Sequence, residues 1–220
     1  MQRLDAANTR IRDDDPLLLV VCALGALMYA VETTTADPPK FILTAGSQWA
    51  QQAQQLILEQ LGNICVDNLM AAILLHEYEL RMANFGNAFM LTGLTARMAQ
   101  ALQINLEHST DILCQNTESG PGASTKESRR RLMWCCYVAD SLVGNGVDQL
   151  TLIKEADVKI QLPCTERNFL LQAPCITEVL EPGHFLKFLK PESLPLYPKD
   201  NMGIRACYLR YISIRRKVLK

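Results

Sequence analysis

The sequence predicts an all-α fold, an irregular multi-helix bundle with an antiparallel, tetratricopeptide-like helix pair. Apolar residues recur at spacings of three and four through most of the 220 residues, which is the pattern of amphipathic helices. Proline, glycine and asparagine stand where such helices would begin or end. No segment alternates apolar and polar residues in the way that a half-buried strand does. These three observations favour helices packed around one core over any sheet.

The first predicted helix covers about residues 16–32, where the chain is almost wholly apolar. Asp15 followed by Pro16 is a favourable helix start, because an acidic N-cap accepts backbone N–H groups and proline fits the first helical position. The apolar run of 16 residues is shorter than the about 20 that cross a bilayer. Residues 13–15 are all aspartate, whereas a signal peptide is basic before its apolar run. The sequence therefore predicts a buried core helix rather than a membrane segment.

Two further helices are predicted in the next part of the chain. One covers about 41–61 and ends at Gly62, a common C-terminal residue of helices. The other covers about 68–83, with Asp67 as its N-cap. The side chains expected on the buried faces of these two helices are Phe41, Ile42, Ala45, Trp49, Ala53, Leu56, Ile57, Leu61, Leu69, Met70, Ile73, Leu74 and Tyr78.

A fourth helix is predicted from an Asn87 cap to about residue 104. Only the short connector 84–86 separates it from the preceding helix, so the two are expected to lie antiparallel as one tetratricopeptide-like unit. Gly93 lies inside this helix, where glycine costs about 1 kcal/mol relative to alanine. A close helix contact is the expected reason for a glycine at that position.

The fifth helix is predicted to begin near Ser124, which has the spacing of a capping box with Glu127. Apolar residues on nearly all of its sides predict a central place in the core. Six prolines separate it from the last predicted helix, about 202–219, and leave room for short helices at about 175–180 and 183–190. The stripe expected to face the core consists of Leu132, Cys135, Cys136, Ala139, Leu142 and Val143.

Composition and motifs exclude several classes of function. The net charge of −1 gives no global positive field that would hold nucleic acid. The eight cysteines include no Cys-x-x-Cys pair, and they are sparser than in secreted disulfide scaffolds, so reduced intracellular thiols are expected. With three histidines, no phosphate loop and no nucleophile elbow, the sequence predicts no catalytic, cofactor-binding or metal-binding residue and no enzymatic activity.

The sequence contains two clusters of basic residues. Arg129, Arg130 and Arg131 are consecutive near the start of the fifth helix, where cations oppose the helix dipole. Nearby carboxylates or an interaction surface would explain them, although a solvated or salt-bridged helix face is the simpler interpretation. In the last predicted helix the basic residues alternate with apolar ones, which is typical of a helix that packs one face on a core.

Three segments, in order, resemble the motifs of one family. They are GNAFMLTGLTARMAQALQI (86–104), ESRRRLMWCCYVAD (127–140) and ADVKIQLPC (156–164). Their order and spacing resemble the fungal-specific transcription factor domain, the middle homology region of zinc-cluster and related zinc-finger regulators, over residues 16–220. The residues that carry the resemblance are Gly93, Arg97, Met98, Ala99, Arg129, Arg130, Arg131, Leu132, Trp134, Asp140, Asp157, Leu162 and Pro163.

The resemblance implies a helical regulatory region in a nuclear protein that controls transcription, with mainly structural roles for the motif residues. One hypothesis pairs Arg97 or the arginine triplet with Asp140 or Asp157 in a partly dry core. Zinc and DNA are expected only at a zinc domain outside this sequence, since the six-cysteine pattern is absent here. Residues 1–15 are expected to be disordered, and residues 16–220 to form one domain that is incomplete at its C-terminus.

Other functions stay open. The chain could be a stand-alone helical interaction module, including a dominant-negative partner, or a helical small-molecule-binding protein or enzyme. Protein partners, a homodimer and a small-molecule effector are compatible with the sequence, whereas no membrane partner is expected. One departure from the family pattern leaves a local turn open: Gly146-Val147-Asp148 stands where Gly-Arg-Pro is common.

Overall fold

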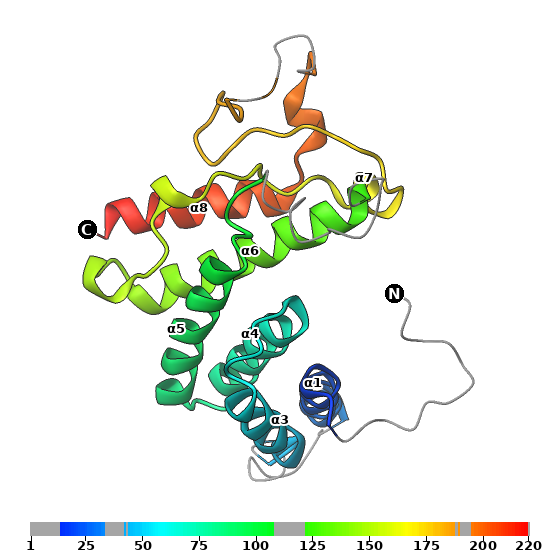
Figure 1. Cartoon of the computed structure of the whole chain (residues 1–220), viewed down its shortest axis with the longest axis vertical. Coiled ribbons are helices and arrows are strands. Elements are labelled where there is room, and N and C mark those ends of the chain that lie inside the picture. The colour runs from blue at the N-terminus through cyan, green and yellow to red at the C-terminus, as the bar shows by residue number, and fades with distance from the viewer. Residues whose placement is uncertain are drawn as a thin grey trace. The chain divides into compact units, whose positions relative to one another are not determined.

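The computed structural model describes residues 14–33, 42, 44–107, 122–187, 189 and 195–219. Within these residues the regular elements are α-helices and short 3-10 turns, and two isolated β-bridges stand in place of any strand. The all-α prediction is confirmed. The chain divides into two compact units, residues 1–98 and 99–220, called here the N-terminal and the C-terminal unit (Figure 1).

The N-terminal unit is built on α1 (Pro16–Thr33), α3 (Ser47–Glu59) and α4 (Val66–Arg81), which pack against one another in all three pairs. The helix α5 (Phe85–Ala101) follows after a short turn and ends just beyond the boundary of the unit. The expected tetratricopeptide-like pairing of the helices now labelled α4 and α5 stays a prediction.

The start and the packing of α1 agree with the sequence prediction. Asp15 Oδ1 accepts hydrogen bonds from the backbone N–H of Leu17 at 3.0 Å and of Leu18 at 3.4 Å, as an N-cap does. Length and composition would allow α1 to cross a membrane, a test that core helices also pass. Its contact with both α3 and α4 favours the core-helix interpretation. Leu19, Val20 and Ala23 are buried in this contact.

The helix α3 begins at Ser47, six residues later than expected from a start near 41. Gly46, just before it, has φ +75°, and a Cβ there would lie 2.4 Å from the carbonyl oxygen of Ala23 in α1. Because glycine alone tolerates both the left-handed conformation and this approach, the turn fixes how closely α3 meets α1. The expected buried face is only partly right, since Ala53 and Ile57 are buried but Trp49 is 44% exposed.

Two predicted helix caps in the N-terminal unit are wrong. The N-cap of α4 is Cys65, without a side-chain hydrogen bond, and Asp67 lies inside the first turn, where a carboxylate still favours the helix dipole. Asn87 lies inside α5, and it donates to Glu79 Oε2 at 3.5 Å instead of capping the helix. Asn84, just before α5, donates to the same oxygen at 2.7 Å.

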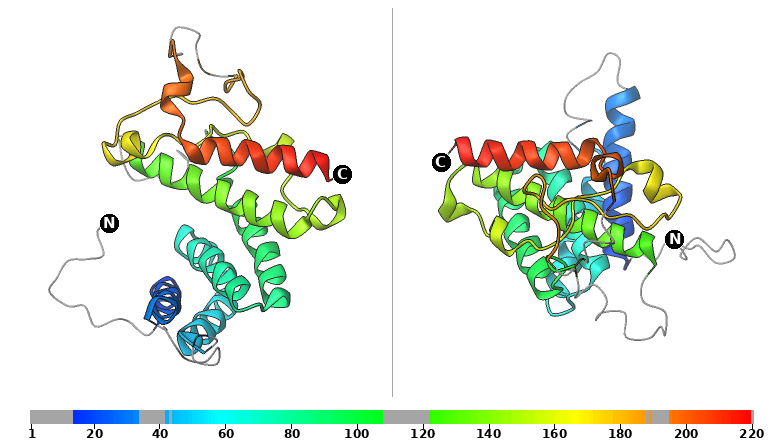
Figure 2. Two further views of the ribbon diagram at one scale, coloured as in Figure 1. Left: turned by 180° about the vertical axis from the view of Figure 1, so that it is seen from behind. Right: turned by 90° about the horizontal axis from the view of Figure 1, so that it is seen from above.

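The C-terminal unit is organised by two helices that lie side by side and run in the same direction, α6 (Ala123–Gly144) and α8 (Ile204–Val218) (Figures 1 and 2). The central position predicted for α6 is confirmed, because Met133, Trp134 and Tyr137 are at most 2% exposed. Within the expected stripe, Cys135 and Leu142 are exposed. The connection between the two helices contains α7 (Glu166–Leu170) and the 3-10 turns Asp148–Leu150, Glu155–Asp157 and Pro198–Asn201.

The room that the sequence left for short helices at 175–180 and 183–190 is not used by the residues described there, which have no regular secondary structure. Part of this segment pairs instead with the residues that precede α7: Leu162 N–H donates to Glu178 O at 2.8 Å. The Thr177 hydroxyl donates to Leu162 O at 2.5 Å. Hydrogen bonds to a neighbouring segment replace those that a helix would have made within itself.

The capping box predicted at the start of α6 is also wrong. The residue before the helix is Gly122, without a side-chain cap, and the Glu127 carboxylate turns to two arginines. At the other end of α6, Gly146 has φ +87°, and a Cβ there would lie 2.5 Å from Cβ of Leu219. In this turn, which departs from the family pattern, a glycine is therefore needed because the backbone lies close to the end of α8.

Candidate functional site

Two of the three sequence motifs meet in the C-terminal unit around a group of charged side chains, two of which, Arg130 and Glu127, are buried. We call this group the arginine cluster; it consists of Arg130, Arg131, Glu107, Glu127 and Glu166. Helix α6 supplies three of these residues at spacings of three and four, so that they share one face. The residues after α5 supply Glu107, and α7 supplies Glu166.

Arg130 and Glu127 are the buried members, with 7% and 3% of the residue exposed. Arg130 Nη1 pairs with Glu127 and its Nη2 with Glu107, and its Nε lies 3.4 Å from the second oxygen of Glu107. Burial by itself would lower the pKa of this guanidinium, but the hydrogen bonds and charges of Glu107 and Glu127 outweigh it and raise the pKa. The pair with Glu107 is thus a two-pronged, charge-assisted contact in a largely dry place.

Arg131 extends the cluster toward α7. Its Nε lies 2.8 Å from Glu127 Oε1 and its Nη1 lies 3.1 Å from Glu166 Oε2. The guanidinium carbon also lies 3.9 Å from the centre of the Phe169 ring, in cation–π geometry. Burial opposes the charge here too, and the two carboxylates again raise the pKa of the arginine.

The carboxylates of the cluster also hold the backbone of the third motif, residues 156–164. Glu127 Oε1 accepts the N–H of Cys164 at 3.0 Å, and Glu107 Oε2 accepts the N–H of Gln161 at 3.2 Å. Trp134 completes the contact from the next turn of α6, because its indole N–H donates to the Gln161 carbonyl at 2.8 Å. One set of buried groups thus ties an irregular segment to the central helix.

A second clamp holds the same connection near the C-terminal end of α6. Both oxygens of Asp140 accept backbone N–H groups, of Leu152 at 2.9 Å and of Ile153 at 2.9 Å. Arg216 of α8 donates to the Ile153 carbonyl at 2.8 Å and to the Thr151 hydroxyl at 2.8 Å. Burial raises the pKa of Asp140, although these N–H groups and the charge of Arg216 oppose the rise.

Two cysteines of this region, Cys136 and Cys164, are buried. Burial and the nearby charge of Glu127 raise the pKa of Cys164 to about 12, and burial also raises the pKa of Cys136. Both side chains are therefore thiols at neutral pH, which are poor nucleophiles and poor metal ligands. Among the described residues no three histidines, cysteines or carboxylates are grouped as a metal site.

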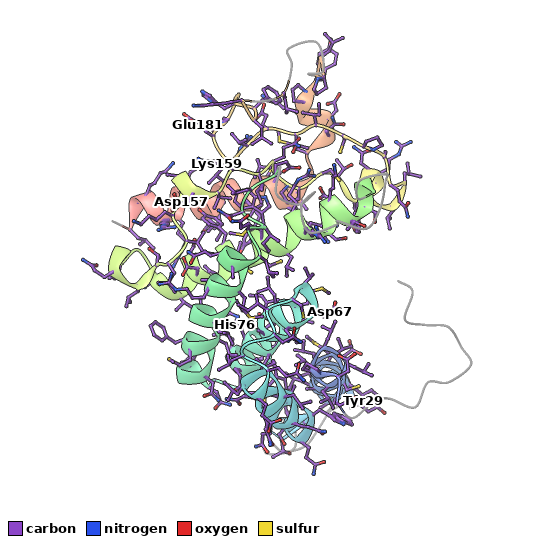
Figure 3. The ribbon with its side chains drawn as sticks, viewed as in Figure 1. Tyr29, Asp67, His76, Asp157, Lys159 and Glu181 are labelled. Carbon is purple, nitrogen blue, oxygen red and sulfur yellow. The ribbon has the colours of Figure 1, made fainter. Side chains whose placement is uncertain are left out.

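The motif residues predicted from the sequence differ in how far they are buried. Most of them are buried, whereas Asp157 is exposed on the connection (Figure 3) and Arg97 is exposed on α5. Gly93 and Arg129 are half-buried. The buried motif residues are Met98, Ala99, Arg130, Leu132, Trp134, Asp140, Leu162 and Pro163.

For Arg130 and Arg131, the hypothesis on the arginine triplet was right about the kind of partner and wrong about the residues. Arg130 and Arg131 pair with glutamates, not with Asp140 or Asp157. The spacing of Glu127 to the arginines could have indicated this pairing, since residues three and four apart are neighbours on a helix. No local signal points to Glu107, which is 23 residues away from Arg130.

A sequence comparison gives the class of the protein. Residues 5–191 match the fungal specific transcription factor domain, so the chain belongs to that family. The helical fold and the convergence of two family motifs on one buried cluster therefore describe a region of a fungal transcription regulator.

Individual relatives agree with this class. A transcriptional regulatory protein of Schizosaccharomyces pombe, described as uncharacterized, is 30% identical over 210 residues, which is 93% of this chain and 21% of the relative. A Zn(2)-C6 fungal-type transcription factor of Fusarium oxysporum f. sp. lycopersici is 28% identical over 200 residues, 90% of this chain and 21% of the relative. The chain thus spans about a fifth of the curated relatives that it matches. No solved structure matches it.

Proposed function

We propose that this chain is the regulatory region of a nuclear transcription factor and that it influences DNA-templated transcription without contacting DNA itself. The observation that carries the proposal is the family match over residues 5–191. The net charge of −1 agrees with it, because binding to the phosphate backbone requires a positive surface. The names of several relatives include Zn(2)-C6, which supports a zinc cluster outside these residues as the DNA-binding part.

The arginine cluster supports a structural role for the family motifs rather than a catalytic one. The guanidiniums of Arg130 and Arg131 bind carboxylates, and those carboxylates bind the backbone of the third motif. Groups held in this way keep the connection between α6 and α7 in one conformation, so the unit presents a fixed surface to a regulator. A protein partner, a second copy of the chain or a small-molecule effector could bind to that surface.

The test uses the full-length protein, expressed from its gene at the native locus. An antibody raised against residues 86–140 should detect, in the nuclear fraction, a band well above the 24.6 kDa of this chain. Arg130→Lys keeps the charge of the cluster but loses the two-pronged contact, and it should change the transcript levels of dependent genes at unchanged nuclear abundance. The matched control is Arg81→Lys, at an exposed pair with Glu77.

Two results would contradict the proposal. The first is a protein of 24.6 kDa that is absent from the nucleus. The second is an Arg130→Lys strain whose transcript levels match those of the wild type while in vitro unfolding shows that the cluster has been weakened. Loss of the protein from the cell would instead be recognised by the immunoblot, and a milder substitution, Trp134→Phe, would then replace Arg130→Lys.

A further inference from the structure

Helix α8 has apolar side chains on two opposite faces. Ala206, Leu209 and Ile212 are buried in the C-terminal unit. On the opposite face Ile204 is 86% exposed and Val218 is 77% exposed, although a helix on a protein surface normally has one apolar side. We call this row the α8 stripe; it consists of the exposed Ile204, Tyr208, Tyr211 and Val218 and the half-buried Arg215.

The spacing of the α8 stripe is that of a helix–helix seam. Its members follow one another at intervals of four, three, four and three residues, the heptad pattern by which two helices pack lengthwise. The rings of Tyr208 and Tyr211 are stacked, with their centres 6.3 Å apart, so the two side chains form one aromatic pair on this face. Ile214, 60% exposed, widens the stripe on one side.

The charges of α8 indicate the chemistry of its partner. The 15 residues Ile204–Val218 contain five cations and no acid. Four of the cations are engaged by the C-terminal unit itself: Arg205, Arg210 and Lys217 by carboxylates, and Arg216 by the second clamp. Arg215, which lies in the stripe, makes one side-chain hydrogen bond, to Asn145 Oδ1 at 2.6 Å, and has no carboxylate partner among the described residues.

We propose that the α8 stripe is a docking surface for an acidic amphipathic helix of another protein. Apolar side chains of that helix would cover the two tyrosines, and a carboxylate would pair with Arg215 across the seam. A second copy of α8 would bring no carboxylate to this position, because the helix contains none. The stripe lies outside residues 5–191 that match the family, so the inference does not depend on the proposed regulatory function.

An anionic membrane fits the surface less well than an acidic helix does. Glu166, 53% exposed, and Glu155, 25% exposed, pair with the cations at the two ends of α8. Because the cations of α8 other than Arg215 are engaged by the C-terminal unit itself, little positive charge remains to attract the headgroups. A helix partner can place its acids beside Arg215 alone, because its charges are at discrete positions.

The experiment measures the binding of a designed helix to the whole 220-residue chain. The probe is a fluorescein-labelled peptide of 18 residues with leucine at the a and d positions of the heptad and glutamate at e and g. A second peptide has lysine in place of each glutamate. Fluorescence anisotropy at low and moderate salt gives the dissociation constants, and circular dichroism checks that each protein variant is folded.

The glutamate peptide should bind more tightly than the lysine peptide, and salt should weaken it. The double substitution Tyr208→Ser with Tyr211→Ser should raise the dissociation constant at least about tenfold, as expected for removing two aromatic anchors. Arg215→Glu should reverse the preference between the two peptides. The matched control, Phe85→Ser with Met90→Ser, removes two exposed apolar side chains of α5 and should leave binding unchanged.

Several outcomes would overturn the inference. Equal binding of the two peptides, or no binding of either, would remove the acidic helix as the partner. A dimer in analytical ultracentrifugation that the tyrosine substitutions dissociate would show that a second copy covers the stripe. Sedimentation of the protein with phosphatidylserine vesicles, lost in the same variant, would show that the stripe binds a membrane instead.

Discussion

The contacts inside the N-terminal unit differ in kind from those inside the C-terminal unit. In the N-terminal unit, helices α1, α3 and α4 meet through small apolar residues, among them Ala23, Ala50, Ala53 and Ala72, each at most 1% exposed. In the C-terminal unit, buried carboxylates and guanidiniums bind one another and the backbone of an irregular connection. Both units have an apolar core, and the C-terminal unit adds this network of charges to it.

The difference follows from what each unit has to hold. Regular helices satisfy their own backbone groups, so they need only matching surfaces. A connection of about 60 residues with few helices leaves N–H and C=O groups that must be paired by side chains. Substitutions should therefore act on the N-terminal unit through volume and on the C-terminal unit through charge.

The largest effect is expected for Arg130→Met, which removes the shared cation and leaves Glu107 and Glu127 buried without it. Breaking one partner of a buried pair costs about 3–5 kcal/mol of unfolding free energy, and urea denaturation measures it. The control Arg81→Met breaks a pair in which both side chains are 46% exposed, and it should cost about 0.5 kcal/mol or less. Equal losses in the two variants would show that charge burial is not what stabilises the C-terminal unit.

A volume change should have the next largest effect, in the N-terminal unit. Gly46→Ala adds a Cβ 2.4 Å from the Ala23 carbonyl oxygen at a residue with φ +75°. Backbone strain and overpacking together should cost about 2–4 kcal/mol of unfolding free energy. Gly62→Ala is the control, because a Cβ there has nothing within 4 Å. If thermal unfolding finds both variants equal to the wild type, α1 and α3 do not need their close approach.

The N-terminal unit should also lose stability on mild acidification. Burial lowers the pKa of His76 below 6.5 against the opposing charge of Glu77, and Nε2 has no hydrogen-bond partner among the described residues (Figure 3). As the pH falls through 6.5 the unfolded chain binds a proton first, so the contribution of His76 is present above that pH and is lost below it.

Hydrogen exchange read by mass spectrometry between about pH 7.5 and 5.5 measures this loss in α4 separately from the rest of the chain. His76→Met should flatten the pH dependence of protection in α4. The control His184→Gln replaces an exposed histidine and should keep the wild-type slope. A slope that survives in His76→Met would assign the pH dependence to another group.

The smallest effect is expected in the C-terminal unit at lower pH. Burial would raise the pKa of Glu178, but the hydrogen bond from Arg210, the Gly183 N–H and nearby positive charges lower it below 4.5. The contribution of this carboxylate is therefore present above pH 4.5 and is lost as the pH falls through the folded pKa. In Glu178→Gln the unfolding free energy should change less steeply below pH 4.5. Glu181→Gln, at a side chain 73% exposed, should behave as the wild type; a matching change there would point to net charge instead.

The parts of the fold that depend on neighbouring residues could be predicted from the sequence. The start of α1 at Asp15 and Pro16, the central position of α6 and the last helix were predicted because caps and periodicity act within a few residues. The alternatives for Glu127 show the limit of such reasoning. A capping box and a buried ion pair both fit its sequence position, and only the tertiary contacts decide between them: Arg130 with Glu107, and the Cys164 N–H with Glu127.

The sequence by itself determined the helical class, most helix positions and the family motifs, since local spacing and residue type specify these. The tertiary structure alone decided that Glu107 pairs with Arg130, that residues 175–178 form no helix and that one face of α8 stays exposed. Each of these depends on which distant segment lies alongside. That neighbouring segment determines whether a charge is desolvated and whether a backbone group is paired. The order of residues along the chain does not identify which segment it is.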